Sequence, residues 1–524
     1  MRRDISLLRK RRFDVVVVGG GIQGACVARD AALRGLSVAL IEQGDFCGAT
    51  SHNSLKTIHG GIRYLQHLNF KRAIESIREQ QIFLRTAPHL VQPLGFLMPT
   101  YGYGMRGPLA LGAGIALFEA LNAGVALRDG RRPAWPKGQL MRAATCRKRA
   151  PGIDPQALTG GAYWADAQVG LADKAVLQIL QQAVDHGACV ANDVQAEQLR
   201  FDPSAPESVC GLGARDMRTG DRFEIAARAV VNATGPWAAD WIRRAGGSRL
   251  SLQVGLVKSM NLVTRKPALP HALAVKSSRA SDSRIDTAKR MFFVVPWQGR
   301  AVIGTTHFTH RDTTLDLRVD QEEIAAFVEE FAAAFPAMGV TTDDILYCYQ
   351  GLTPGDDTVT EDGAKLHESR IVDHATTDGI GGVFSIVSIK WTTARLVAEQ
   401  AVDRLLDQWK DRRACQTRHT RIPDYPGMPH DTCGLSDAGL RDFVVAHVEN
   451  TQAFRLDDIV LRRTNDLVSG RMSAQHFAVI EQTLADHFNW SVEQRRAETQ
   501  QVLNRLPPSS FRHRLINELE ATSI

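Results

Sequence analysis

The feature that most constrains this chain is a mostly β-branched run near its start, which leads directly into a glycine-rich turn. Residues 13–18 (FDVVVV) have the composition of a strand buried on both faces of a parallel sheet. Residues 22–34 follow with helical spacing, and Gly35 stands where a glycine commonly ends a helix. Residues 37–41 (SVALI) form a second apolar run. Together these segments predict one βαβ unit of an α/β fold.

The turn between the first strand and the helix has the glycine spacing of a dinucleotide site. Gly19 allows a tight turn, Gly21 lets the backbone approach a pyrophosphate, and Gly24 permits close packing of the helix. The helix N-terminus offers N–H groups to the phosphates. Glu42 follows the second strand and is expected to accept hydrogen bonds from a ribose. Because NAD and FAD both use this pattern, it predicts the kind of site and leaves the cofactor open.

The segment after the βαβ unit favours FAD. Residues 49–65 (ATSHNSLKTIHGGIRYL) are polar and rich in glycine. Such a stretch is suited to lining a long cofactor with backbone amides and hydroxyl groups. We therefore predict FAD as the cofactor.

Chain length and strand pattern predict several domains. At 524 residues and 57.6 kDa the chain is too long for one hydrophobic core. A second buried run at 229–237 is expected to return to the nucleotide-binding sheet, and short strand-like runs follow it. We predict an α/β fold whose oxidoreductase body covers 1–410 and whose C-terminal helical domain covers 411–524. Within the body we expect a Rossmann-type FAD-binding domain (approximately 1–100, 160–245 and 350–410) with an inserted antiparallel β substrate domain (mainly 246–349).

Composition and spacing exclude several classes of protein. The net charge is +6, but Lys and Arg are interspersed with acidic residues, so we expect no nucleic-acid partner. The eight cysteines are scattered without a CxxC pair, which favours a cytoplasmic protein, and the histidine spacing predicts no metal site. Residues 107–127 are long and apolar enough to be tested as a membrane span. They contain Glu119, Asn122 and four glycines, so we expect a buried or membrane-facing surface helix instead.

Motifs along nearly the whole chain resemble the FAD-dependent glycerol-3-phosphate dehydrogenase family, a branch of the D-amino-acid-oxidase-like flavoproteins. The segments that resemble it are 19–35 (GGGIQGACVARDAALRG), 50–66 (TSHNSLKTIHGGIRYLQ), 87–99 (APHLVQPLGFLMP), 230–238 (VVNATGPWA), 292–297 (FFVVPW), 303–306 (IGTT), 389–399 (IKWTTARLVAE) and 456–464 (LDDIVLRRT). The resemblance implies hydride transfer from a substrate carbon to flavin N5. It also implies that a membrane quinone or oxygen reoxidises the flavin.

The resemblance assigns roles by position. FAD contacts are expected at Gly19, Gly21, Gly24, Glu42, Thr50, Ser51, His59, Gly60, Gly61 and Thr392. Phosphate and substrate oxygens are expected at Arg63, Arg370 and Lys390. These three residues suit a phosphate dianion, because arginine supplies forked donors and lysine supplies a point charge.

The chain departs from the family pattern on the substrate side. Where the family has Lys-Gly-Ser-His, this chain has Lys258-Ser-Met-Asn261, and an expected arginine is replaced by Thr353. His307 stands in place of an acid, and Ser388 with the following isoleucine replaces a glycine pair. The changes cluster where substrate is expected, which indicates a retained cofactor and an altered substrate site.

These departures bear on proton transfer. An alcohol gives up a hydride only as its hydroxyl proton is lost, and an asparagine cannot take that proton. We therefore predict that His307 or His59 handles the proton. The candidate catalytic residues are His59, His307, Asn261 and Lys390, and the candidate substrate-binding residues are Arg63, Arg370, Lys390, Thr353 and Lys258.

The leading hypothesis is an FAD-dependent dehydrogenase of glycerol 3-phosphate or a related polyol phosphate. A second hypothesis keeps FAD but makes the chain an oxidase of an amine, an amino acid or a hydroxy acid, and peroxide formation would distinguish it. A third is a flavin-binding protein that has lost the alcohol chemistry and serves in assembly or regulation. Peripheral contact with the inner face of the cell membrane and a homodimer both stay open.

Overall fold

The computed structural model describes residues 1–65, 69–103, 107–130, 137–277, 291–309, 317, 319–355 and 369–522. It confirms the βαβ unit, with β1 (Phe13–Val18), α2 (Ile22–Leu33) and β2 (Val38–Ile41) in sequence. Strands β1 and β2 run parallel. Val15 and Val17 pack on one side of the sheet and Val16 and Val18 on the other, so β1 is buried on both faces as its composition predicts.

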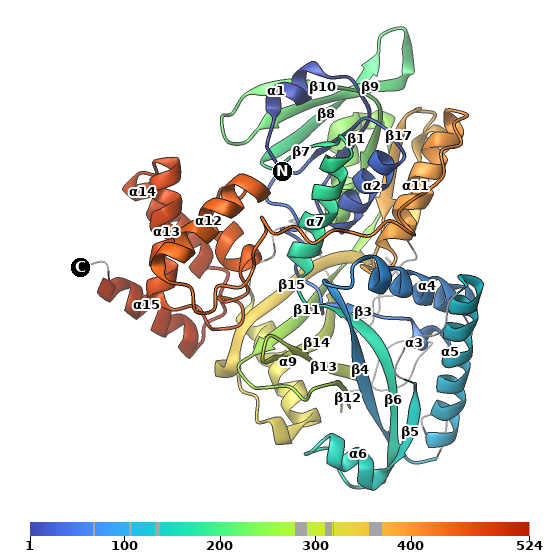
Figure 1. The fold of residues 1–524 in the computed structure, drawn as a ribbon, viewed down its shortest axis with the longest axis vertical. Coiled ribbons are helices and arrows are strands. Elements are labelled where there is room, and N and C mark those ends of the chain that lie inside the picture. Colours follow the sequence, from blue (N-terminus) through green and yellow to red (C-terminus); the bar gives the residue numbers. More distant parts are fainter. Residues whose placement is uncertain are drawn as a thin grey trace.

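The first sheet has the strand order β16-β17-β10-β1-β2-β7 and forms the upper part of Figure 1. Along this order the neighbouring pairs are parallel except β16 with β17 at one edge. Strands β9 and β8 extend the sheet from β10 by antiparallel pairing. Helices α2, α7 and α11 pack together against one face, and α1 and α8 contribute to the core on the other face. The remaining bounds here are α1 (Ile5–Lys10), α7 (Ala172–Asp185), β7 (Cys189–Ala191), β8 (Val194–Asp202), β9 (Ala205–Asp216), β10 (Arg222–Asn232), η1 (Gly235–Trp237), α8 (Ala238–Gly246), η2 (Gly247–Arg249), β16 (Arg370–Asp373), α10 (His374–Thr377), β17 (Val383–Val387) and α11 (Ala394–Gln408).

The second sheet is mainly antiparallel and has the order β15-β11-β14-β13-β12-β4-β6-β3, with β5 paired to β6. Helix α9 packs on one face near β11 and β13, and α4 and α5 cover the region of β4 and β6. The bounds are β3 (Thr57–Ile58), α3 (Ile62–Leu65), α4 (Phe70–Thr86), β4 (Val91–Tyr101), α5 (Pro108–Arg128), β5 (Gln139–Arg142), α6 (Ala143–Arg149), β6 (Leu158–Val169), β11 (Gly255–Thr264), β12 (Ala272–Lys276), β13 (Met291–Trp297), β14 (Arg300–Thr309), α9 (Gln321–Ala334), η3 (Pro336–Met338), η4 (Thr342–Asp344) and β15 (Ile345–Gly355).

The second sheet takes in more of the chain than the predicted substrate domain does. The prediction assigned 91–100 and 160–169 to the FAD-binding domain, but these residues lie in β4 and β6 of the second sheet. Residues 350–355 also lie there, in β15. The strands pair with partners that are distant in sequence, so local composition does not reveal which sheet they join.

The C-terminal region is helical, as its pattern predicts, but it shares a core with the second sheet. Its elements are α12 (Asp437–Thr451), the π-helix η5 (Asp458–Arg463), α13 (Ala474–Phe488), α14 (Val492–Leu503) and α15 (Ser510–Thr522), coloured orange to red in Figure 1. Leu456, Val460 and Phe477 pack in one cluster with Val263 of β11 and Tyr349 of β15. The helices therefore cover one end of the second sheet.

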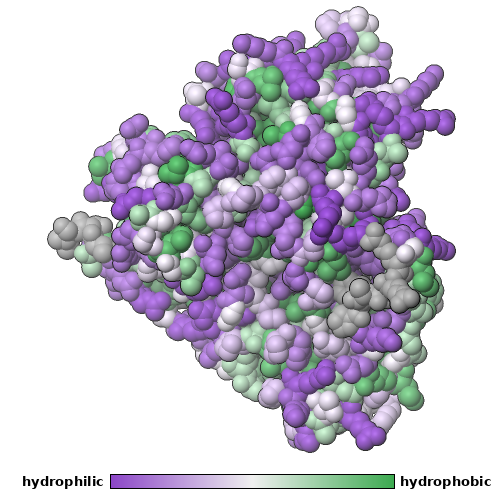
Figure 2. All heavy atoms as spheres, in the orientation of Figure 1, coloured by the Kyte–Doolittle hydropathy of each residue, from purple (hydrophilic) through white to green (hydrophobic). Residues whose placement is uncertain are grey.

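Helix α5 (Pro108–Arg128) covers nearly all of the segment tested as a membrane span. Among the described residues it is the helix long and apolar enough to cross a membrane, judged by length and composition. It contacts α3, α4, β5 and β6, and 28% of its most apolar window is buried. It thus lies on the protein surface with one side packed, and Figure 2 shows hydrophobic residues along the edge of the molecule where Figure 1 places α5.

Candidate active site

The glycine turn permits close backbone packing that a side chain would block. Gly19 has a φ of +112°, and a Cβ there would lie 2.5 Å from the Ala233 carbonyl oxygen. A Cβ at Gly24 would lie 1.9 Å from the Gly19 carbonyl oxygen, so only glycine lets α2 approach the strand this closely. Helix α2 begins after Gly21, which provides no side-chain cap of its own, and Ser51 Oγ accepts only the Ile22 N–H. Its first turn can therefore offer N–H groups and the positive end of the helix dipole to an anion.

Glu42 occupies the position of the ribose-binding acid after β2. Its carboxylate accepts the Gly20 N–H at 2.6 Å and the Gly44 N–H at 2.9 Å. Burial raises the pKa of Glu42, and the two backbone donors oppose that rise. The glycine turn, the uncapped helix and this held acid fit the diphosphate and ribose of FAD.

The segment after Glu42 joins the two sheets. Thr50 Oγ1 donates to the Leu352 carbonyl at 2.8 Å, and Ser51 Oγ accepts the Ile22 N–H at 3.0 Å. Trp391 Nε1 donates to the Ser51 carbonyl at 3.3 Å. The two hydroxyl residues expected at FAD thus lie between the N-terminus of α2 and strand β15.

A buried carboxylate holds the glycine pair further along this segment. Gly61 has a φ of +83°, and the Gly60 N–H donates to Asp166 at 2.5 Å. Asp166 also accepts Gln80 Nε2 at 2.8 Å and Trp164 Nε1 at 3.0 Å. Burial raises the pKa of Asp166 to about 6 against these three donors. Sequence reasoning missed this residue, although an aspartate inside the apolar run of β6 was a usable signal.

One face of the second sheet brings two predicted catalytic residues together. Ser259 of β11 lies opposite His307 of β14, and its Oγ is 2.9 Å from His307 Nδ1. Two positions on, Asn261 Oδ1 accepts Thr305 Oγ1 at 2.7 Å. Because alternate positions of a strand share a face, Ser259 and Asn261 point the same way.

This polar face lies against the FAD-binding segment. Gly351 of β15 pairs with Ser259, and a Cβ at Gly351 would lie 3.1 Å from Thr50 Cγ2. Thr353 follows on the same face, and its hydroxyl is 3.5 Å from the Val257 carbonyl oxygen. The face thus meets the segment that begins at Thr50.

Lys258, a predicted substrate-binding residue, lies away from the polar face. It alternates with Ser259 and so lies on the opposite face of β11, where its ammonium pairs with Glu323 of α9. That face also packs Met260 against the α9 core. Lys258 therefore ties α9 to the sheet and does not line the polar face.

Lys390 lies near the glycine-pair segment. Its Nζ is 3.9 Å from the centroid of the Tyr64 ring, and the His59 ring centroid is 6.4 Å from that of Tyr64. Gln23 Nε2 of α2 donates to the Lys390 carbonyl at 3.2 Å and to Ser388 Oγ at 2.9 Å. The loop that contains Ser388, where the family has two glycines, is therefore fixed to the start of α2.

The remaining predicted site residues near Lys390 in the motif, and the two predicted arginines, have few described contacts. Arg370 is exposed at the edge strand β16, and its guanidinium donates to the Gln253 carbonyl. The side chain of Arg63 lies outside the described residues. Thr392 is buried beside Lys390 at the approach to α11.

The C-terminal region reaches the dinucleotide site through Asp45, three residues after Glu42. Arg462 Nε and Arg463 Nη2 lie 2.5 and 2.7 Å from its carboxylate oxygens, and all three side chains are buried. Burial alone would raise the pKa of Asp45, but the two guanidinium groups bring it below its ordinary value. Sequence reasoning did not identify this contact, because the partners are far apart in the chain.

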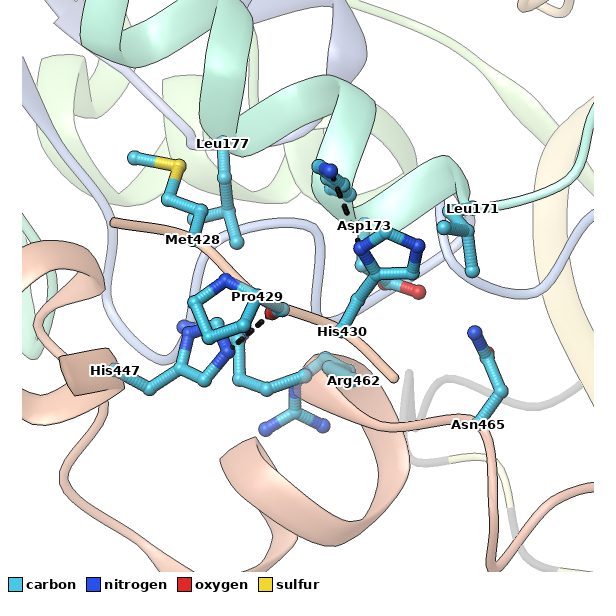
Figure 3. Close-up of a pocket in the computed structure, with 11 residues that line it drawn as sticks. Leu171, Asp173, Leu177, Met428, Pro429, His430, His447, Arg462 and Asn465 are labelled. Carbon is cyan, nitrogen blue, oxygen red and sulfur yellow. Dashed lines mark hydrogen bonds between the residues drawn. The ribbon is translucent and has the colours of Figure 1, made fainter. Parts of the chain in front are cut away.

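A small cavity lies beside this cluster, between α7 and the C-terminal region (Figure 3). His447 Nε2 is 2.6 Å from the Pro429 carbonyl, and His430 Nδ1 is 3.1 Å from Lys174 Nζ. Asp173 also lines the cavity, and its carboxylate lies 2.9 Å from Nδ1 of the buried His52. The cavity belongs to the contact between the two regions. Among the described residues no cluster of His, Cys, Asp and Glu has the arrangement of a metal site.

Comparison with known proteins agrees with this geometry. A family model described as FAD dependent oxidoreductase (DAO) matches residues 14–404. A glycerol-3-phosphate dehydrogenase of Synechocystis sp. is 30% identical over 94% of this chain and 96% of that protein. An aerobic glycerol-3-phosphate dehydrogenase of Staphylococcus haemolyticus is 30% identical over 87% of this chain and 78% of its own length.

A solved structure shares the fold as well. The glycerol-3-phosphate dehydrogenase from Bacillus halodurans, complexed with FAD, superposes with a TM-score of 0.69 at 21% identity and covers 98% of this chain and 96% of that one. With the glycine turn, the held acid and the family match over residues 14–404, the chain belongs to the DAO family of FAD-dependent oxidoreductases, on the branch of the glycerol-3-phosphate dehydrogenases.

Proposed function

We propose that this enzyme oxidises glycerol 3-phosphate or a closely related polyol phosphate. The observation that supports this most is the polar face of Ser259, Asn261 and His307, which meets the FAD-binding segment in a chain whose relatives are named for that substrate. When bound, FAD supplies a two-electron acceptor for a hydride. The chain's own residues must then bind the phosphate, orient the alcohol and take its proton.

His307 is the proposed acceptor of the alcohol proton. Its Nδ1 is paired with Ser259 Oγ at 2.9 Å, which fixes the ring and leaves Nε2 as the other nitrogen of the imidazole. A neutral imidazole can accept a proton near neutral pH, whereas the amide of Asn261 can only orient a hydroxyl through hydrogen bonds. His59 is the second candidate for the same role.

We propose Lys390 as a phosphate contact, because a hydrogen bond from Gln23 holds its backbone in place. Gln23 holds its carbonyl, so the position of the loop is set by the N-terminus of α2. Arg63, Arg370 and Thr353 are proposed to complete the phosphate and substrate contacts. Fixed cations are favourable partners for a phosphate, because little conformational entropy is lost when it binds.

The reduced enzyme needs a second substrate that removes the electrons. We propose a membrane quinone or oxygen in this role, in a cytoplasmic enzyme that meets the inner face of the cell membrane and forms a homodimer. Oxygen consumption measured beside reduction of a water-soluble quinone would separate the two acceptors.

The test is to mix the flavin-loaded protein anaerobically with glycerol 3-phosphate and follow the oxidised flavin absorbance. We expect rapid bleaching, slowed in His307→Ala and unchanged in His186→Ala, which removes an exposed imidazole at the end of α7. If flavin is present and glycerol 3-phosphate leaves it oxidised, the proposed substrate is wrong. Peroxide formed from an amine, amino acid or hydroxy acid would then support the oxidase hypothesis.

A further inference from the structure

A line of hydrogen bonds crosses the first sheet from the end of β10 to the short helix α10. Asn232 of β10 lies beside Ser385 of β17, because these parallel strands pair with the two residues in register. Asn232 Nδ2 donates to Ser385 Oγ at 3.1 Å, and His374 Nε2 lies 2.9 Å from the same oxygen. His374 Nδ1 lies 2.6 Å from Asp378 Oδ2. Asn232, Ser385 and His374 are fully buried, so the line runs through the interior of the FAD-binding sheet.

The hydrogens along this line all point toward Asp378. Its carboxylate also accepts the hydroxyl groups of Ser251 at 2.8 Å and Thr377 at 2.7 Å. Burial would raise the pKa of Asp378, but hydrogen bonds from His374, Thr377 and Ser251 bring it below its ordinary value. A carboxylate can only accept, so Nδ1 of His374 carries the hydrogen, and Nε2 of the neutral ring accepts the Ser385 hydroxyl.

The other end of the line holds the turn that lies against the glycine turn. Asn232 Oδ1 accepts the Thr234 N–H at 3.2 Å and the Thr234 hydroxyl at 2.7 Å. Asn232 Nδ2 also donates to the Ala238 carbonyl at 3.0 Å, so one side chain holds the residues on both sides of η1. The Ala233 carbonyl oxygen is the atom that a Cβ at Gly19 would meet at 2.5 Å. A shift of this turn would therefore displace the glycine turn.

The same order of groups, serine, histidine and aspartate, activates the nucleophile of serine hydrolases. Here Ser385 lies inside the sheet with no exposed surface, so no substrate can reach its Oγ. A polar group in the centre of a parallel sheet costs free energy unless it is hydrogen-bonded. Ser385 is bonded on both sides, by Asn232 and by His374, which favours a role in fixing positions over a role in chemistry.

We propose that His374 is a positioning residue for FAD. By accepting the Ser385 hydroxyl it leaves the Ser385 oxygen free to accept Asn232, and this orients the Asn232 amide. Asn232 then fixes η1 and the turn before it against the glycine turn, where the diphosphate of FAD is expected. A site fixed before the cofactor arrives loses less conformational entropy on binding. This role concerns the cofactor, so it holds whichever alcohol the enzyme oxidises.

Two substitutions at His374 separate the roles of its two nitrogens. His374→Gln can place an amide oxygen where Nε2 accepts the Ser385 hydroxyl. His374→Asn can place an amide N–H where Nδ1 donates to Asp378, but its side chain is too short to reach Ser385. Dilution of the flavin-loaded full chain, with released FAD followed by its fluorescence, measures the dissociation constant of FAD. We expect His374→Asn to raise this constant at least about tenfold and His374→Gln to stay within about threefold of the native enzyme.

Ser385→Ala interrupts the line at a single oxygen and carries the test if a change at His374 prevents folding. It should also raise the dissociation constant of FAD at least about tenfold. Ser469→Ala is the matched control, because it removes an equally buried hydroxyl in the C-terminal region, where Ser469 Oγ donates to the Asp466 carbonyl at 3.4 Å. This control should bind FAD like the native enzyme. Far-UV circular dichroism checks that each variant is folded.

Equal loss of FAD from His374→Asn and His374→Gln, or native FAD affinity in Ser385→Ala, would overturn the proposal. Native FAD affinity in every variant, together with a lower unfolding temperature, would mean that the line only stabilises the sheet, and His374 would then have no positioning role. No reducing substrate is present in these measurements. A native enzyme that binds FAD but is not bleached by glycerol 3-phosphate would therefore count against the proposed substrate alone.

Discussion

Replacing Asp166 with asparagine should change how stability depends on pH. Burial raises the pKa of Asp166 from 3.8 to about 6 in the folded enzyme. Between these values the folded state holds a proton that the unfolded chain has released. The stability from this group is therefore fully present below about pH 4 and lost as the pH rises through about 6. The whole difference corresponds to about 3 kcal/mol.

Asparagine is neutral throughout this range, so Asp166→Asn lacks that dependence. Its single oxygen can still accept Gly60 and Gln80, but its amide then opposes the Trp164 N–H, and an unsatisfied buried donor costs about 1–3 kcal/mol. We expect the variant to be less stable than the native enzyme near pH 4.5. Above pH 7 the buried carboxyl of the native enzyme is ionised, which lowers its free energy of unfolding. The native enzyme and the variant should therefore be similarly stable there.

The assay is urea unfolding followed by tryptophan fluorescence at pH 4.5, 6 and 8. The difference in unfolding free energy between the native enzyme and Asp166→Asn should change by about 2 kcal/mol across this series, because the carboxyl of the unfolded chain is already mostly ionised at pH 4.5. Glu207→Gln removes an exposed carboxylate and is the matched control. If native and Asp166→Asn curves stay parallel over the whole range, the buried carboxylate does not titrate as argued.

Three further predictions test the FAD site and the polar face. Gly24→Ala would place a Cβ 1.9 Å from a backbone oxygen, so this variant should purify without the visible absorbance of flavin. Arg463→Met removes one partner of the buried Asp45 and should destabilise the protein by about 3–5 kcal/mol, measured by thermal unfolding, with part of the loss recovered when Asp45→Asn is added. Lys258→Met should leave kcat/KM for the reducing substrate unchanged and should lower the unfolding temperature. Asn261→Ala should lower kcat/KM by on the order of tenfold or more. Equal effects of the two changes on kcat/KM would contradict the placement of these residues on opposite faces of β11.

The βαβ unit was predictable because each of its signals is local. The strand at 13–18 ends in four consecutive valines, Gly19 has a positive φ, and a Cβ at Gly24 would meet the carbonyl oxygen of Gly19 within the same turn. The second sheet was less predictable. Strands β4 and β6 join it by pairing with each other and with strands from elsewhere in the chain, and local composition does not encode those partners.

The site residues also divide into those that local sequence predicts and those that depend on distant pairing. Lys258 and Asn261 were both assigned to the substrate side from their places in one motif. They are three positions apart on a strand, so they point to opposite faces, and only the strand register shows which face meets the segment that begins at Thr50. Asp166 and Arg463 were missed because their partners, Gly60 and Asp45, are far away in the sequence.

The strand register also shows that two of the departures from the family pattern lie next to each other. A glycine of the family motif is replaced by Ser259 of β11, and the acid that follows the family's IGTT motif is replaced by His307 of β14. The two replacements lie far apart in the sequence, but their side chains form one hydrogen-bonded pair, with Ser259 Oγ 2.9 Å from His307 Nδ1. Ser388, a third replacement, is held by Gln23 Nε2 and lies 2.9 Å from Ser369 Oγ. Substitutions that acquire partners in this way are typical of a site reshaped as a unit, which favours an enzyme adapted to a related substrate over a flavin-binding protein that has lost its chemistry.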